Sequence, residues 1–159
     1  MKEYSEAEIK SKAEVYCSSL ERCPSDVEEK IHKWGASEEV TERIMAHLQK
    51  ERYLDAARFC RFYVRDKYRF NQWGRMKIAQ MLRMKRLSDE DIRAGLEEID
   101  TEEYDGILKK MLKQKMKGIK AANDYERSMK LIRFAVGRGF TLEEVRRFVN
   151  QVESDEYFD

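Results

Sequence analysis

The sequence predicts an all-α protein made of three tandem three-helix repeats, about nine helices in an elongated array. Three observations support this: helix starts recur along the 159 residues, Pro24 is the single proline that could break a helix, and one apolar pattern repeats at nearly constant spacing. Strand-like alternation is hard to find. A hydrophobic share of 42% favours thin cores between small units over one large core.

Helix starts are marked by Ser, Thr, Asp or Asn with an acid three residues later, because the two side chains cap each other's exposed amides. Boxes of this kind begin at Ser5, Ser25, Ser88, Asn123 and Thr141. Caps without the full box are expected at Ser37, Asp55 and Thr101, with a further start near Trp73. Together they predict about nine helices.

Apolar residues at helical spacing follow these starts and predict the buried faces. The stripes are Ile9, Ala13, Tyr16 and Leu20; Val27, Ile31 and Trp34; Val40, Ile44 and Leu48; Ile92, Leu96 and Ile99; Met129, Ile132 and Val136; and Val145, Val149 and Val152. Gly35, and Gly137 with Gly139, stand where left-handed helix C-caps belong.

An internal repeat sets the domain organisation. The run from Ile78 to Leu96 matches the run from Leu131 to Val149 without gaps at an offset of 53 residues, and Val27 to Ser37 matches Ile78 to Ser88 at 51. We therefore expect three-helix units at 1–52, 53–100 and 101–153, followed by an acidic C-terminal tail at 154–159. The alternative is one irregular helical domain in which caps happen to recur.

Charge is unevenly distributed, although the formal net charge is only +1. Residues 50–86 contain twelve Lys or Arg and three acids, a net of +9. A second basic run, without acids, comprises Lys109, Lys110, Lys113, Lys115, Lys117 and Lys120. The positive middle is expected to face phosphates or carboxylates.

The candidate partner-binding residues are basic side chains of this middle segment: Arg58, Arg61, Arg65, Arg69, Arg75 and Lys77. The first four fall in one stripe of a helix, and guanidinium groups bind both phosphate and carboxylate. Phe59 and Tyr63 fall on the opposite, packing arc. The alternative for the stripe is a solvated face with intrahelical ion pairs.

Two further patterns have more than one interpretation. Tyr68, Phe70 and Trp73 lie near an expected loop and could stack on bases, although most aromatic residues here are expected in the core. The lysine run could form a membrane-surface helix, but a helix packed in the third unit is simpler.

No arrangement of residues typical of an enzyme is present, so catalytic and cofactor sites are not expected. Cys17, Cys23 and Cys60 are expected as free thiols, since their spacing with His32 or His47 matches no usual zinc pattern. The charged N-terminus shows no signal peptide or membrane span, which predicts a cytoplasmic protein without a membrane partner.

The chain resembles the RecX family, regulators of the bacterial recombinase RecA. The resemblance rests on Leu54 to Arg65, on Trp73-Gly74-Arg75 leading into Lys77-Ile78, and on Leu131 to Phe140. Two positions depart from the family pattern: Ala56 replaces a usual Asp, and Arg86 replaces a glycine at a helix end. At Arg86 the C-cap needs either a right-handed residue or strain.

The resemblance implies three tandem three-helix repeats and a monomeric, non-enzymatic protein that acts in DNA repair, recombination and the SOS response. It further implies binding to the RecA filament, with inhibition of recombinase, ATPase and co-protease activity. A helical module that binds single-stranded DNA without RecA is the alternative, and it predicts tight, salt-dependent DNA binding by the chain alone.

Overall fold

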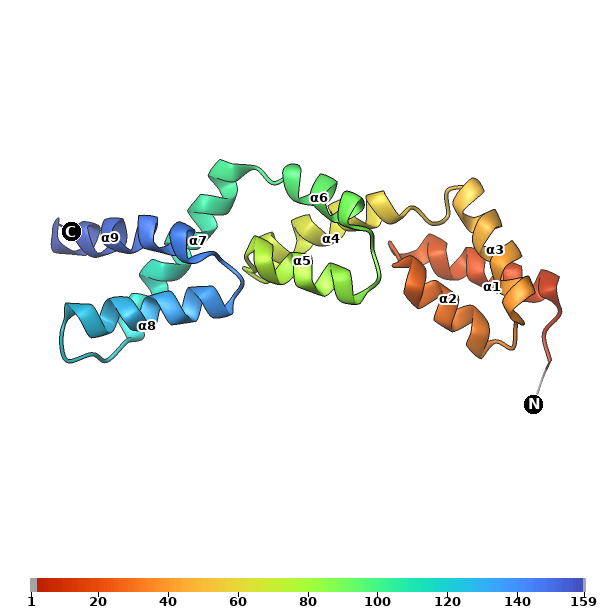
Figure 1. The fold of residues 1–159 in the computed structure, drawn as a ribbon, viewed down its shortest axis with the longest axis horizontal. Coiled ribbons are helices and arrows are strands. Elements are labelled where there is room, and N and C mark those ends of the chain that lie inside the picture. Colours follow the sequence, from red (N-terminus) through yellow and green to blue (C-terminus); the bar gives the residue numbers. More distant parts are fainter. Residues whose placement is uncertain (1–2, 159) are drawn as a thin grey trace.

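The computed structural model describes the backbone of residues 3–158 and the side chains of residues 3–151. Over that backbone range the chain forms nine helices and no strand, which confirms the predicted fold class. The helices follow one another in three groups of three along an elongated molecule, with the two ends of the chain at opposite ends of its long axis (Figure 1).

The first group contains α1 (Glu6–Ser19), α2 (Pro24–Lys33) and α3 (Glu38–Lys50). Ser5 forms the predicted capping box, since its hydroxyl accepts a hydrogen bond from the Glu8 amide at 3.1 Å while the Glu8 carboxylate accepts one from the Ser5 amide. The box predicted at Ser25 is wrong. Cys23 is the N-cap of α2 and Pro24 opens the helix, which suits a residue without an amide hydrogen.

The second group contains α4 (Ala56–Phe70), α5 (Arg75–Met84) and α6 (Asp89–Glu97). Asp55 and Ser88 are the N-caps of α4 and α6, as predicted, although the Asp91 side chain does not complete the box expected at Ser88. The start near Trp73 is made by Gly74.

The third group contains α7 (Thr101–Gly118), α8 (Asp124–Gly137) and α9 (Leu142–Phe158). Asp100, not Thr101, caps α7: its carboxylate accepts from the Glu103 amide at 3.2 Å. Asn123 caps α8, and Thr141 forms its predicted box with Glu144. The side chain of Val152 and those of the expected acidic tail lie outside the described residues, although the backbone of α9 continues through Phe158.

The second helix of each group ends at a left-handed residue. Gly35 has φ 99° and Gly139 has φ 100°, as predicted, whereas Gly137 is still helical. The equivalent residue in the middle group is Arg86, with φ 66°. A side chain therefore occupies a conformation that favours glycine.

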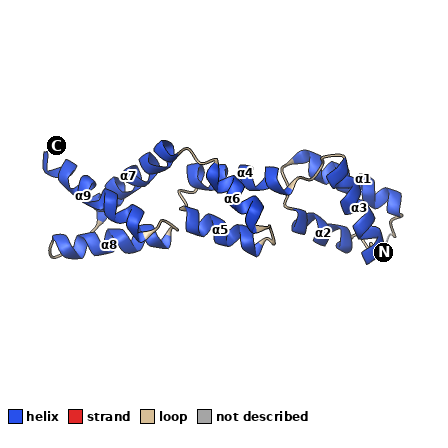
Figure 2. Cartoon of the chain, turned by 45° about the horizontal axis from the view of Figure 1, so that its top comes forward, coloured by secondary structure: helices blue, strands red, loops and turns tan. Residues whose placement is uncertain are grey.

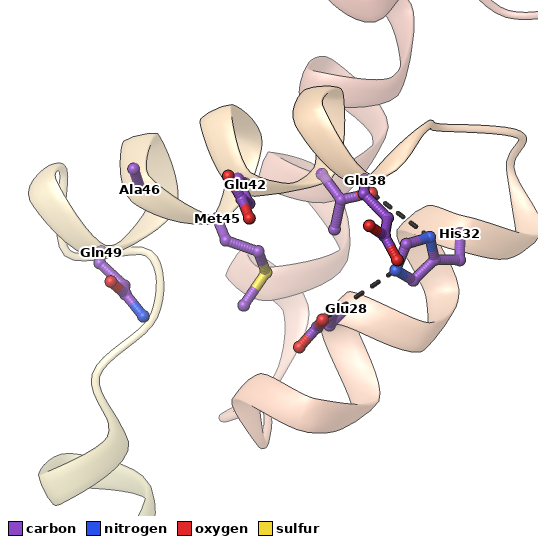
Figure 3. Close-up of a pocket in the computed structure, with 8 residues that line it drawn as sticks. Glu28, His32, Glu38, Glu42, Met45, Ala46 and Gln49 are labelled. Atoms are coloured by element: carbon purple, nitrogen blue, oxygen red, sulfur yellow. Dashed lines mark hydrogen bonds and ion pairs between the residues drawn. The ribbon is translucent and has the colours of Figure 1, made fainter.

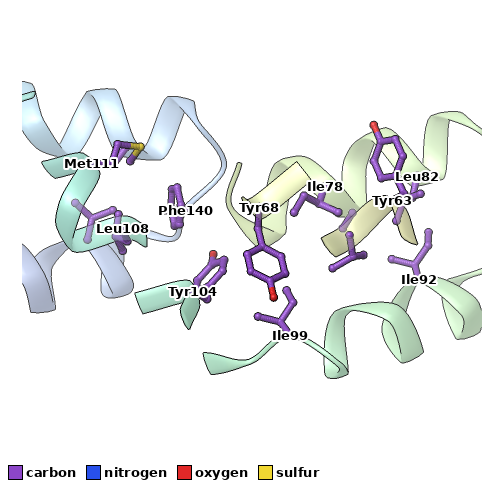
Figure 4. Packing of buried hydrophobic residues seen from close by; sticks show 14 of the residues in the cluster. Tyr63, Tyr68, Ile78, Leu82, Ile92, Ile99, Tyr104, Leu108, Met111 and Phe140 are labelled. Atoms are coloured by element: carbon purple, nitrogen blue, oxygen red, sulfur yellow. The ribbon is translucent and has the colours of Figure 1, made fainter. Parts of the chain in front are cut away.

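Buried side chains divide into two cores. One lies within α1–α3 and includes Ile31, Ile44 and Leu48. The other is continuous through α4–α9, where Tyr68 and Tyr104 meet between the groups (Figure 4). Leu20 is 63% exposed, so its predicted place in the first core is wrong. The spacing of the three groups is also visible from a second direction (Figure 2).

Candidate partner-binding surface

The arginine stripe forms one face of α4, as the helical spacing predicts. Phe59 and Tyr63 point inward and are buried, at 7% and 8% exposure, whereas Arg65 and Arg69 are exposed. Tyr68, expected near a loop, is instead buried in the core at 3% exposure. The stripe exists, but its members differ in what they contact.

Arg58 and Arg69 join neighbouring groups of helices. The Arg58 Nε donates to both carboxylate oxygens of Glu21, each at 2.9 Å, and so links α4 to the segment after α1. An Arg69 Nη2 donates to Glu103 Oε2 at 3.1 Å and links α4 to α7. Arg58 and Glu103 both stand three residues after an N-cap, so each junction has an ion pair at this position, with a cation at the first junction and an acid at the second.

Arg61 and Arg65 remain at the surface. Arg61 lies 3.7 Å from Glu98, a long and half-exposed ion pair. Arg65 has no carboxylate within 4.0 Å among the described side chains, and Phe62 beside it is 53% exposed. Of the four arginines on α4, Arg65 is the one most available to a partner.

Arg75 and Lys77 lie on α5 and do not extend the stripe. Arg75 stacks its guanidinium 4.1 Å from the Tyr104 ring centroid and lies 3.2 Å from Glu144. Its backbone amide donates to the Tyr104 hydroxyl at 3.0 Å. Arg75 therefore stabilises the contact between the second and third groups, and burial raises the pKa of the Tyr104 phenol.

A second basic surface alternates cations with aromatic rings, and we name it the cation–aromatic ladder. It comprises Lys85, Tyr63, Lys67, Trp73, Lys77, Arg138, Phe134 and Lys115. The Trp73 ring lies between Lys67 Nζ at 5.1 Å and Lys77 Nζ at 4.5 Å. Across the junction, Phe134 lies between Lys115 Nζ at 4.7 Å and the Arg138 guanidinium at 5.3 Å.

Several ladder cations are not neutralised. Lys77, Lys115 and Arg138 have no carboxylate within 4.0 Å among the described side chains, although an Arg138 Nη1 donates to the Asn71 carbonyl at 3.1 Å. Lys67 and Lys85 have long ion pairs, at 3.8 Å to Asp66 and 3.7 Å to Asp26. The ladder therefore offers positive charge over both the second and third groups.

Of the ladder cations, only Lys77 was a sequence candidate. The sequence did contain a signal for other ladder cations. At three places, an aromatic residue is followed four positions later by a Lys or Arg of the ladder. These pairs are Tyr63 with Lys67, Trp73 with Lys77, and Phe134 with Arg138. Side chains four residues apart are neighbours on a helix. The pairs at α4 (Tyr63 with Lys67) and α8 (Phe134 with Arg138) could therefore have been predicted from spacing alone.

The first group has a groove of opposite character between α2 and α3. It has a volume of about 490 Å³, and Figure 3 shows Glu28, Glu38 and Glu42 around it, with Met45 on the α3 side. His32 lies at its end, 4.0 Å from Glu28. This groove is acidic and does not continue the basic surface.

The cysteines are buried and unpaired. Cys17 lies in the first core, whereas Cys23 and Cys60 lie in the second. Burial raises the pKa of the Cys17 and Cys60 thiols to about 11, so both are protonated at neutral pH. Among the side chains the structure describes, no three His, Cys, Asp or Glu residues are grouped as metal ligands.

The lysine run lies on α7 except for Lys120, which follows the helix. The apolar residues of the same helix, Leu108, Met111, Leu112 and Met116, are buried in the second core. The helix packs within the third group, as the simpler interpretation predicts. Of the helices described, none combines the length and the apolar character needed to cross a bilayer.

Family models match the two groups that carry the ladder. Residues 55–96 match the model described as RecX, second three-helix domain, and residues 102–149 match RecX, third three-helix domain. The two matches together cover more than half of the 159 residues. The chain belongs to the RecX family. The matched ranges contain α4, α5 and α8, all but one residue each of α6 and α7, and the first eight residues of α9.

Curated relatives are likewise named Regulatory protein RecX. The relative from Clostridium perfringens strain 13 is 25% identical over 136 residues, which are 84% of this chain and 63% of that protein. The relative from Pectobacterium atrosepticum is 27% identical over 146 residues, 92% of this chain and 87% of that protein. The chain thus spans less than two thirds of the C. perfringens protein and most of the P. atrosepticum one.

Solved RecX structures share the fold. A crystal structure titled regulatory protein RecX superimposes with a TM-score of 0.79 at 23% identity, covering 91% of this chain and 74% of that one. The crystal structure of RecX from Lactobacillus salivarius gives 0.83 at 15% identity, covering 93% and 96%. These similarities support the three-group architecture.

Proposed function

We propose that this RecX-family chain binds the RecA–DNA filament in the cytoplasm, as a monomer without catalytic activity of its own, and inhibits the recombinase, ATPase and co-protease activities of RecA. Membership in a family of regulatory proteins supports the role. We choose the ladder as the contact surface because its Lys77, Lys115 and Arg138 are basic groups without carboxylate partners among the described side chains.

The availability of its charges favours the ladder over the arginine stripe as the main contact. Arg58, Arg69 and Arg75 hold the helical groups together, so a partner would have to compete with Glu21, Glu103 and Glu144 for them. Lys77, Lys115 and Arg138 need no such exchange, because no carboxylate among the described side chains pairs with them. Arg65, which is also positively charged, forms with Phe62 a second candidate contact on α4. Exposed arginine and aromatic side chains are common at binding hot spots.

The test is RecA ATP hydrolysis on single-stranded DNA during titration with substoichiometric amounts of the chain. Lys77→Glu with Lys115→Glu should raise the concentration for half inhibition by at least about tenfold, a loss of about 1.4 kcal/mol. The matched control is Lys12→Glu with Lys30→Glu, which reverses two lysines lying near the Tyr16 and Trp34 rings of the first group. Equal inhibition by both double variants would exclude the ladder as the contact.

The same ladder favours a second candidate function, direct binding of single-stranded DNA without RecA. Each phosphate that a lysine neutralises releases counterions, so affinity should fall steeply with salt. Tight, salt-sensitive DNA binding by the chain alone, together with an unchanged RecA ATPase, would select this function. Inhibition of RecA at ratios where the chain alone leaves DNA unbound would select the filament regulator.

A further inference from the structure

We infer that the first three-helix group is a separate body that pivots on the rest of the chain, whereas the second and third groups move as one. The two junctions between the groups differ in a way that does not depend on the proposed function. The repeat makes the junctions comparable, because equivalent positions in each contact the next group along the chain. The two junctions nevertheless use different kinds of contact.

The junction between the second and third groups is closed by backbone hydrogen bonds. The Gly74 amide donates to the Arg138 carbonyl at 2.9 Å, and the Met76 amide donates to the Gly139 carbonyl at 3.0 Å. A Cβ on Gly74 would overlap the backbone of Gly139 and Phe140, so only glycine permits this approach. Such contacts leave little freedom to rotate.

A buried network reinforces that junction. Tyr104, fully buried, accepts from the Arg75 amide at 3.0 Å, and its ring centroid lies 5.2 Å from that of Phe140. Arg75 also reaches Glu144, which caps α9 through Thr141. The shared core continues through this point (Figure 4).

Equivalent positions, aligned by the repeat offsets or, for α4 and α7, by counting from the N-caps Asp55 and Asp100, show why the first junction has no such network. Pro24 stands at the position of Arg75 and has no amide hydrogen to donate, and Phe59 stands at the position of Tyr104 and has no hydroxyl to accept. Cys23 and Arg86 replace the two glycines, so the backbones cannot approach as closely. The equivalent hydrogen bonds cannot form.

Side chains make the first junction instead. The Ser25 hydroxyl donates to the Lys85 carbonyl at 2.8 Å, Lys85 lies 3.7 Å from Asp26, and Arg58 pairs with Glu21. A hollow of about 450 Å³ lies between the groups here. Among the described residues, Cys23 is the one member of the first group that lies in the second core.

The pivot lies between Leu54 and Asp55. Leu54 is buried in the first core, at 2% exposure, and Asp55 begins α4. Flexing there leaves the first core intact and disturbs the second core only at Cys23. The other contacts that it stretches are made by side chains, and two of them are ion pairs screened by salt. The movement changes the separation between the acidic groove of the first group and the ladder.

The test is a comparison of spin-label distance distributions across the two junctions of the full chain. Labels go on exposed sites in each group: Ala7→Cys with Ala94→Cys spans the first junction, and Ala94→Cys with Gln114→Cys spans the second. Native Cys17, Cys23 and Cys60 are buried, so they react slowly. The first distribution should be at least about twice as wide as the second, and wider again in high salt.

Distributions of equal width would overturn the pivot. Native-state hydrogen exchange of the unlabelled chain provides a readout that needs no variant. Core amides of Ile31, Ile44 and Leu48 should share one opening free energy, and those of Leu82, Leu108 and Leu131 a different one. A single opening free energy for all six would contradict two separate bodies.

Discussion

The backbone amide of Gly74 donates a hydrogen bond to the carbonyl oxygen of Arg138 at 2.9 Å, which joins the loop before α5 to the end of α8. These residues are 64 positions apart in the sequence, yet the contact is made by backbone alone. Its geometry depends on the absence of a side chain at Gly74. The backbone hydrogen bonds between these two three-helix groups thus depend on one glycine.

Gly74→Ala should lower the free energy of unfolding by about 2–4 kcal/mol, because the new methyl group would separate the α4–α6 and α7–α9 groups and break both backbone hydrogen bonds. Urea unfolding followed by circular dichroism measures the change. Gly106→Ala is the matched control. Gly106 lies within α7 with open space around it, so alanine there should stabilise the protein by up to about 1 kcal/mol.

Arg86→Gly should raise the free energy of unfolding by about 0.5–1 kcal/mol. Its φ of 66° costs an L-residue about 1–2 kcal/mol, which exceeds the extra chain entropy that glycine loses on folding. Arg86→Ala controls for the lost charge and should leave stability nearly unchanged. Gly35→Ala, at φ 99°, should destabilise the protein. A glycine at position 86 that fails to stabilise would show that the Arg86 side chain makes a compensating contact.

Local signals predicted the helices well. Caps at Ser5, Ser37, Asp55, Ser88 and Asn123, and the left-handed Gly35 and Gly139, depend on neighbouring residues and were predicted from them. Ser25 failed as a cap because α2 already begins at Pro24, with Cys23 as its N-cap, and the Ser25 hydroxyl donates instead to the Lys85 carbonyl, 60 residues away. A contact of that kind has no local signal.

The surface was harder to predict for the same reason. Spacing placed the α4 arginines on one face, but whether each is free depends on acids in other groups, such as Glu21 and Glu103. The ladder combines α4, α5, α7 and α8, and periodicity within one helix does not reveal which helices meet. The pairing of an aromatic residue with a cation four positions later was the missed clue.

Arg58→Ala and Arg65→Ala should separate the structural and surface roles of the arginine stripe. Arg58 holds Glu21 with two hydrogen bonds, so its removal should cost about 1–2 kcal/mol of stability. Arg65→Ala should change stability by less than about 0.5 kcal/mol, because no carboxylate among the described side chains pairs with it. Urea unfolding of both variants decides the matter, and equal losses would refute this division of roles.

The order of stability between the Tyr104→Phe variant and the unaltered protein should reverse as pH rises. At pH 7 the variant should be less stable by about 1 kcal/mol, since the Arg75 amide loses its acceptor. Burial raises the pKa of the Tyr104 phenol in the folded state. The folded protein therefore keeps a phenol proton that the unfolded chain releases near the ordinary tyrosine pKa of about 10. The stabilisation that the Tyr104 proton provides is fully present below about pH 10 and is lost as the pH rises above it.

Above pH 10 the unaltered protein should therefore weaken by up to about 1.4 kcal/mol per pH unit from Tyr104, a loss that the phenylalanine variant lacks. Burial also raises the pKa of Tyr63 and of the Cys17 and Cys60 thiols, but these groups are present in both proteins and cancel in the comparison. Urea unfolding at steps from pH 7 to pH 11 gives the two curves. A stability difference that stays constant with pH would mean that the Tyr104 proton is no more tightly held in the folded state than in the unfolded one.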